Sequence, residues 1–304
     1  RSTLFPYTTL FRSRDVDIEL EAMKKVPHNF SELLEDELTS DEIETLRTSF
    51  DTIGDIVILE IPENLEDKKF KIGEAALKFT KRRSIYMKKS AVKGTTRVRD
   101  LEFLAGVDDS VTIHKEHGAR LKLDVREVYF SPRLATERKR VMESVKDGEN
   151  ILDMFCGIGP FPIVIAKNRN VTVSAVDINE EAIRYLNENI RLNKLKGSIE
   201  TYCGDVRDVS PNFKCKFDRI IMNLPGLAYT FLDVAVDLIE DSGIINYYEF
   251  SDSYDQGEKR LNDACAKVGK TAKIINTRKV KSTSPGEWHI SIDAKIEKER
   301  NNYF

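Results

Sequence analysis

The chain has 304 residues, of which 40% are hydrophobic and 33% charged, enough to build one large or two modest domains with full cores. Its net charge of −3 argues against a uniformly basic nucleic-acid binder. No apolar run reaches the length of a membrane span, no signal peptide is visible, and the four scattered cysteines indicate free thiols in a reducing cytoplasm.

The first part of the chain has the pattern of an α+β domain. Residues 1–13, RSTLFPYTTLFRS, resemble translated sequencing-adapter sequence and are left out of the fold. Residues 19–46 favour helix, with a cap and acidic residues in TSDEIETL. A strand is predicted at 55–61 and a helix at 71–83, and the alternation from 84 to 130 indicates a meandering sheet. We therefore expect a smaller α+β domain over 14–132.

One segment of this domain is strongly basic. Residues 78–99 contain nine Lys or Arg and no Asp or Glu, with Phe79, Tyr86 and Met87 among them. A solvated charged face is the ordinary interpretation of such a run. In a slightly acidic chain, the run also fits a surface that binds phosphates.

From Asn150 the pattern changes to strands alternating with helices. NILDMF, VTVSAVDI, SIETYCGD and FDRIIMNL have the apolar character of buried parallel strands. The pattern predicts an α/β fold with a doubly wound parallel sheet over 133–304, preceded by a boundary in the charged helix 133–145.

The ends of the first three strands carry residues suited to a nucleotide-like ligand. Gly157 and Gly159 permit close backbone approach after the first strand, although a lone Gly-x-Gly is a weak signal. Asp177 ends the second strand and can accept both ribose hydroxyls of an adenosine, or alternatively cap the next helix. Asp205 ends the third strand.

The fourth strand ends at Asn223, Leu224 and Pro225, where proline stops the ladder. A strand-to-helix turn explains this by itself, but a carboxamide and a ring can also hold a planar base. Because ligands of open α/β sheets bind at the carboxyl ends of strands, the four ends together predict an S-adenosylmethionine-dependent methyltransferase. His114 and His117 do not have convincing metal-ligand spacing, and no metal site is expected.

Four stretches resemble the archaeal/eukaryotic tRNA (guanine(37)-N1)-methyltransferase family: DVREVYFSPRLATER (124–138), DMFCGIGPF (153–161), MNLPGLAYTFLD (222–233) and KSTSPGEWHISID (281–293). The resemblance implies a Rossmann-like class I methyltransferase domain behind a smaller RNA-contacting α+β domain. It implies methyl transfer to N1 of G37, with the tRNA anticodon stem-loop as partner, in a cytoplasmic monomer without metal or membrane.

The resemblance also assigns roles to residues. Glu137 matches the general base that removes the N1 proton, Arg97 the arginine that stabilises charge on guanine O6, and Asn223 with Pro225 the residues that hold the base. Cofactor contacts are implied for Arg138, Asp153, Phe155, Gly157, Gly159, Pro160, Phe161, Asp177, Ile178, Asp205, Val206 and Asn223.

Two other functions remain open. One is a wybutosine-pathway aminocarboxypropyl transferase, which uses the same cofactor but transfers a larger group. The other is a non-catalytic RNA-binding protein with a retained fold, against which the presence of Glu137, Asp177, Asp205 and Asn223 argues. The position of Glu137 among Arg and Lys residues also fits a structural salt bridge.

Overall fold

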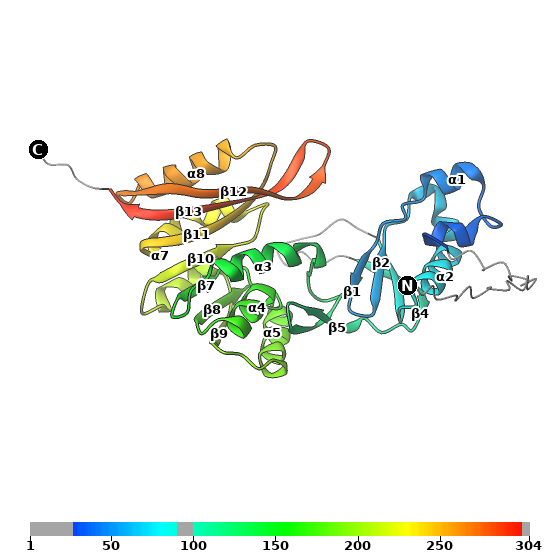
Figure 1. Cartoon of the computed structure of the whole chain (residues 1–304), viewed down its shortest axis with the longest axis horizontal. Helices are drawn as coiled ribbons and strands as arrows, with labels where there is room; N and C mark the ends of the chain where they lie inside the picture. Colours follow the sequence, from blue (N-terminus) through cyan, green and yellow to red (C-terminus); the bar gives the residue numbers. More distant parts are fainter. Residues whose placement is uncertain (1–26, 90–99, 300–304) are drawn as a thin grey trace, which may run out of the picture.

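A computed structural model describes residues 27–89 and 100–299. Figure 1 shows a smaller lobe built on a four-stranded sheet and a larger lobe built on a seven-stranded sheet, with a two-stranded hairpin between them. Within the described residues, no helix is both long and apolar enough to cross a bilayer.

The smaller lobe has the sheet order β1-β2-β3-β4. Strands β2 and β3 are parallel and are connected through α2, whereas the other neighbours are antiparallel. The helices cover one face, on which Val57, Ile72 and Ile85 are fully buried in one core cluster. The expected α+β architecture is confirmed. Its elements are β1 (Asp51–Ile53), β2 (Ile56–Leu59), β3 (Ser84–Lys88), β4 (Leu101–Gly106), α1 (Ser40–Thr45), α2 (Lys69–Thr80) and 3-10 turns at Phe30–Leu34 and Glu63–Lys68.

The helical prediction for 19–46 is only partly correct. Residues 19–26 lie outside the described residues, and the remainder contains one 3-10 turn followed by the six-residue α1. The cap predicted within TSDEIETL is present, and the structure places it at Thr39, in a capping box with Glu42. Because Thr39 has extended backbone angles, the same residue that starts α1 prevents a continuous helix through this stretch.

The prediction of one meandering sheet over 84–130 is wrong in its second half. β3 and β4 pair in the smaller sheet, but β5 (Val111–Glu116) and β6 (Ala119–Asp124) form a separate hairpin. Leu121 and Leu123 of this hairpin share a core with Ile56 of the smaller sheet and with Val164 and Leu186 of the larger lobe. The hairpin is therefore the packing element that joins the two lobes.

The larger sheet has the order β12-β13-β11-β10-β7-β8-β9, in which β7 to β11 are parallel and the last two strands are antiparallel. Its helices pack on both faces, α3 to α5 on one and α6 to α8 on the other, which confirms the doubly wound prediction. The strands are β7 (Asn150–Asp153), β8 (Thr172–Asp177), β9 (Ser198–Cys203), β10 (Phe217–Met222), β11 (Ile239–Ser251), β12 (Lys270–Ser284) and β13 (Glu287–Lys298). The helices are α3 (Ala135–Ser144), α4 (Pro160–Asn168), α5 (Glu180–Leu192), α6 (Val206–Val209), α7 (Leu232–Leu238) and α8 (Asp255–Ala266), with 3-10 turns at Pro132–Leu134, Ser210–Asn212 and Ala228–Phe231.

The turn between β1 and β2 packs closely against β5 at Gly54. Gly54 has a φ of +58°, and a Cβ there would lie 2.1 Å from Thr112 Oγ1 and 2.8 Å from Ile113 O in β5. Gly148 has a φ of +90°, but a Cβ there would point into open space, with no atom beyond its chain neighbours within 4 Å. We expect Gly54→Ala to lower the free energy of unfolding by about 1–3 kcal/mol more than Gly148→Ala in urea titrations. Equal losses would show that backbone strain alone, without the contact to β5, determines the effect.

Candidate functional site

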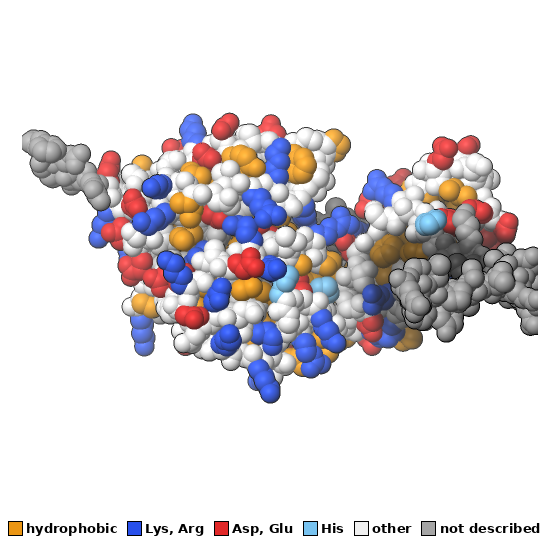
Figure 2. All heavy atoms as spheres, in the orientation of Figure 1, with side chains coloured by type: hydrophobic (Ala, Val, Ile, Leu, Met, Phe, Trp, Pro, Cys, Tyr) orange, Lys and Arg blue, Asp and Glu red, His pale blue; other side chains and the backbone are white. Residues whose placement is uncertain are grey.

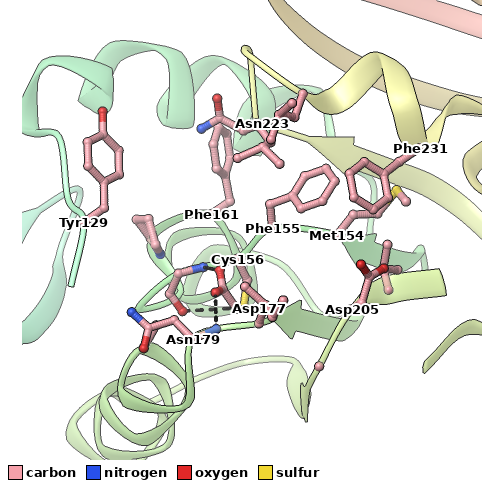
Figure 3. A pocket seen from close by; sticks show the side chains of 18 of the residues that line it. Tyr129, Met154, Phe155, Cys156, Phe161, Asp177, Asn179, Asp205, Asn223 and Phe231 are labelled. Carbon is pink, nitrogen blue, oxygen red and sulfur yellow. Dashed lines mark hydrogen bonds between the residues drawn. The ribbon is translucent and has the colours of Figure 1, made fainter. Parts of the chain in front are cut away.

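A cavity of about 260 Å³ lies at the carboxyl ends of β7, β8, β9 and β10 (Figure 3). Each of these strands contributes to its wall at or just beyond its last residue. The segment between β6 and α3, and the turn after β10, supply the remaining sides. The lining includes Met154, Phe155, Cys156, Gly157, Pro160, Phe161, Asp177, Ile178, Asn179, Asp205, Val206, Arg207, Asn223, Leu227, Phe231, Tyr129, Phe130 and Arg138.

The glycine turn after β7 has the left-handed backbone that its sequence suggests, with φ of +54° at Gly157 and +81° at Gly159. The two glycines do different things. Gly157 lines the cavity, whereas a Cβ on Gly159 would lie 2.2 Å from Leu186 Cδ1 in α5. Gly159, the N-cap residue of α4, therefore leaves room for packing against α5, while Gly157 is the residue that brings the backbone to the cavity.

Asp177 joins the glycine turn to the end of β8. Its Oδ2 accepts a hydrogen bond from Gly157 N at 2.7 Å, and its Oδ1 accepts one from Asn179 N at 2.9 Å (Figure 3). Burial raises its pKa, and these backbone donors oppose the rise. The side chain that caps α5 is Asn179, which accepts from Glu181 N, so the capping alternative does not account for Asp177.

Asp205 has a different environment at the end of β9. Its carboxylate caps α6 and accepts hydrogen bonds from Arg207 N and Nε, both at 2.9 Å. The Arg207 side chain is the largest cause that lowers the pKa of Asp205. The guanidinium of Arg207 also lies over the Phe231 ring at 4.6 Å. Sequence reasoning missed Arg207 and Phe231; their closeness to Asp205 and Asn223 in the chain was the available signal.

Asn223 brings a carboxamide to the cavity from the end of β10. Its Oδ1 is buried and accepts no hydrogen bond from any of the described residues. A buried unpaired oxygen costs about 1–3 kcal/mol, so an unpartnered carboxamide on a residue that lines the cavity fits a ligand that donates an N–H. Pro225 does not line the cavity; its carbonyl accepts from Phe250 N at 3.2 Å and anchors the turn to β11.

Arg138 reaches the cavity from α3 and is only 1% exposed. Its Nη2 donates to Glu116 Oε2 at 2.6 Å and to Ser131 O at 3.1 Å. Burial raises the pKa of Glu116, but hydrogen bonds from His114 and Arg138 outweigh it and leave the pKa below its usual range. His114 Nδ1 also accepts from Gly54 N in the smaller lobe, at 3.3 Å. Sequence reasoning missed Glu116 because its partner lies in a different element.

The proposed catalytic residues are not all on the wall. Glu137 does not line the cavity; it is 3% exposed, and its carboxylate accepts hydrogen bonds from Arg140 and Tyr248. Arg97 lies outside the described residues. Among the residues that the structure describes, no group of three or more His, Cys, Asp or Glu is placed to hold a metal.

Several cations in the described part of the basic segment 78–99 pair with acids from other elements. Residues 90–99 lie outside the described residues, but Lys89 pairs with Glu102 at 3.0 Å and Lys88 lies 3.5 Å from Asp51. On the face shown in Figure 2, Lys and Arg side chains are interspersed with acidic ones. The run of cations in the sequence is therefore not an uncompensated patch over its described part.

These features define a Rossmann-like α/β protein with a cavity at the carboxyl ends of its parallel strands. Residues 112–275 match the family model described as the TRM5/TYW2 methyltransferase domain, and residues 30–110 match the TYW2 N-terminal domain. The chain belongs to the TRM5/TYW2 methyltransferase family.

The chain is also similar to individual members of this family. The chain is 41% identical over 285 residues to tRNA (guanine(37)-N(1))-methyltransferase Trm5b of Pyrococcus abyssi, covering 92% of this chain and 84% of the relative. It is 36% identical to the tRNA(Phe) (4-demethylwyosine(37)-C(7)) aminocarboxypropyltransferase of Methanocaldococcus jannaschii, covering 82% and 98%. The structure of Methanocaldococcus jannaschii Trm5 in complex with adenosine matches with a TM-score of 0.77 at 37% identity, covering 90% and 79%.

Asp153, at the end of β7, gives the site a pH-dependent stability. It is 1% exposed, and burial followed by the charge of Asp177 raises its pKa to about 8 from an ordinary 3.8, against one hydrogen bond from Phe155 N. Between these values the folded state holds a proton that the unfolded state has lost, so stability decreases as pH rises and levels off above about 8.

We therefore expect Asp153→Asn, which cannot ionise, to raise the free energy of unfolding by about 2–5 kcal/mol at pH 8 and to change it little at pH 4. Urea unfolding at both pH values, without added cofactor, measures the difference. Asp208→Asn, at an exposed carboxylate, is the control and should be neutral at both. An equal change at the two pH values for Asp153→Asn would contradict the protonated state.

Proposed function

We propose that this protein transfers a methyl group from S-adenosylmethionine to N1 of guanosine 37 in the anticodon loop of tRNA, in the cytoplasm. The observation that carries the proposal is that Asn223, which lines the cavity, has a carboxamide oxygen without a hydrogen-bond partner among the described residues. A guanine presents N–H donors along the edge that contains N1, which such an oxygen can accept. The Pyrococcus abyssi relative bears the name of this activity.

The described residues fit the cofactor. The carboxylate of Asp177 has lone pairs left for ribose hydroxyls after accepting its two backbone hydrogen bonds, and Ile178 and Val206 supply apolar surface. Gly157 admits close approach, while Phe155, Pro160 and Phe161 line the same cavity. Asp205 is engaged by Arg207, so we assign the adenine end to these two residues together. When bound, the cofactor supplies an electrophilic methyl group on its sulfonium.

The protein must also remove the guanine N1 proton, because the protonated nitrogen is a poor nucleophile. We assign this step to Glu137, with Arg97 stabilising charge on O6 and Pro225 shaping the turn that holds the base. The position of Arg138 beside Ser131 suits contact with the cofactor near the base. These roles rest on the family resemblance together with the placement of α3 against the cavity.

The second candidate is transfer of the aminocarboxypropyl group. It is favoured by the match of residues 30–110 to the TYW2 N-terminal domain and by the coverage of the aminocarboxypropyltransferase relative. Incubation with a tRNA transcript bearing G37 and, separately, with a tRNA bearing 4-demethylwyosine at position 37, each followed by nucleoside mass analysis, separates the candidates. A gain of one methyl on guanosine supports our proposal. An aminocarboxypropyl adduct on a 4-demethylwyosine tRNA, or no product on either substrate, contradicts it.

Cofactor affinity should depend on Asp177. We expect Asp177→Ala to weaken S-adenosylmethionine binding by about 1.5–3 kcal/mol, because a charged acceptor is lost and the glycine turn is released. Isothermal titration calorimetry measures this. Asp218→Ala is the matched control, since Asp218 also accepts a backbone N–H, from Asn150 at 2.8 Å, but at the opposite end of the sheet. Similar S-adenosylmethionine affinities for both variants would show that Asp177 does not bind the cofactor.

Glu137→Gln should slow the chemical step by about a hundredfold to ten-thousandfold, because the amide keeps the shape but cannot take a proton. Single-turnover methylation gives the rate, and tRNA and cofactor affinities should stay close to wild type. Glu143→Gln, at an exposed position of the same helix, is the control. A near wild-type rate for Glu137→Gln would show that Glu137 is not the base and has only a structural role in its salt bridge.

A further inference from the structure

A buried polar network surrounds Glu137. Arg140, one turn further along α3, donates from Nη2 to Glu137 Oε1 at 2.6 Å and from Nε to Oε2 at 3.0 Å. Tyr248 of β11 donates its hydroxyl to Oε1 at 2.8 Å. The Glu137 and Tyr248 side chains are almost completely buried. Three donors from two elements therefore fix the orientation of one carboxylate.

A second carboxylate shares the same guanidinium. Arg140 Nη2 also donates to Asp293 Oδ1 at 3.1 Å, from β13, and Asp293 is 4% exposed. Asn246 Nδ2 donates to Asp293 Oδ1 at 2.6 Å, and Asn276 Nδ2 to Oδ2 at 3.2 Å. Arg140 thus lies between two carboxylates. Because the two carboxylates share one guanidinium, each weakens the stabilisation that Arg140 gives to the other.

The network reaches the cavity through the register of the sheet. Met222 at the end of β10 pairs with Tyr247 of β11, and Pro225 O accepts from Phe250 N at 3.2 Å, so this register places Asn223 next to Tyr248. The Tyr248 ring also lies 6.2 Å from the ring of Phe161, which lines the cavity. The tyrosine that holds Glu137 is therefore adjacent to the carboxamide that we assign to the base.

We propose that Tyr248 and Asp293 are positioning residues that set the orientation and the basicity of Glu137. This inference rests on the proposed function. The Tyr248 hydroxyl stabilises the ionised form of Glu137 and makes it a weaker base. Asp293 acts in the opposite direction, because it draws on Arg140 and places a second negative charge nearby, which makes Glu137 a stronger base.

The other titratable and charged groups that face this network do not take over the hydrogen bonds of Tyr248 and Asp293. Burial, and then the charge of Glu137, raise the pKa of Tyr248 well above its usual value, so its hydroxyl remains a donor. Burial lowers the pKa of Arg140, but its hydrogen bonds to the two carboxylates give a net rise. His289 of β13 packs against the Tyr248 ring at 5.5 Å, and Arg219 joins through Asn246 at 3.0 Å.

The test is the pH dependence of single-turnover methylation of G37, from about pH 5 to about pH 8.5. The wild-type rate should rise with pH and then level off. Tyr248→Phe should move the midpoint of this rise upward by about 0.5 pH unit or more, and Asp293→Asn should move it downward by a similar amount. Both changes preserve shape, and a loss of stability alone does not move a midpoint in opposite directions.

Tyr247→Phe is the matched control, because Tyr247 is equally buried on the neighbouring position but donates to Glu249 on the other face. Its midpoint should equal that of wild type. In a Glu137→Gln background the rise should be absent, and Tyr248→Phe should add no further shift. Equal midpoints for Tyr247→Phe and Tyr248→Phe, shifts of the same sign for Tyr248→Phe and Asp293→Asn, or a rise that survives in Glu137→Gln would overturn the inference.

Mass analysis of the product nucleoside separates two kinds of failure. If wild type forms methylguanosine at position 37 while the midpoints do not move, the positioning role fails and the proposed function stands. If wild type forms no methylguanosine, the proposed function fails and the inference fails with it. Should Tyr248→Phe unfold, the midpoint of Asp293→Asn compared with wild type still tests the inference, because only a downward shift agrees with it.

Discussion

The hydrogen bond between Gly157 N and the Asp177 carboxylate is the contact on which the cavity depends. It ties the left-handed turn after β7 to the end of β8, and the second bond to Asn179 ties the start of α5 to the same carboxylate. Because backbone groups rather than a cation satisfy Asp177, each oxygen keeps a lone pair for a ligand. A single partly buried carboxylate thus joins two strands and leaves part of its bonding capacity for the proposed cofactor.

One side of the cavity, formed by residues 129–131 and Arg138, is connected to the smaller lobe. The buried pair of Glu116 and Arg138 connects the β5–β6 hairpin to α3, and His114 connects the same hairpin to Gly54. The wall of the cavity and the orientation of the smaller lobe therefore depend on one set of contacts. Under the proposed function, this connection fixes the smaller lobe relative to the cavity that receives the base.

The buried charges serve geometry more than stability. Desolvating a pair such as Arg138 and Glu116, or a cluster such as Glu137, Arg140 and Asp293, costs about as much as the attraction returns. What these pairs provide is a fixed arrangement of side chains that would otherwise sample several rotamers. Placing two of them between α3 and its neighbours keeps that helix in register with the strand ends.

The local parts of the fold were predictable from sequence because they depend on neighbouring residues. The alternation of strands and helices after Asn150, the cap at Thr39 and the stop at Pro225 follow from periodicity and from backbone preferences. The acids at successive strand ends could also be assigned to one edge, since parallel strands place their carboxyl ends together.

Contacts between distant segments were decided only by the tertiary structure. Tyr248 meets Glu137 across 111 residues, and Glu116 meets Arg138 across 22 residues and two elements. The pairing of Lys89 with Glu102 could not be read from a run without acids, because the acid comes from the next strand of the sheet. Such contacts leave no periodic pattern in the chain. They arise when packed surfaces bring together buried polar groups that must find partners inside the protein.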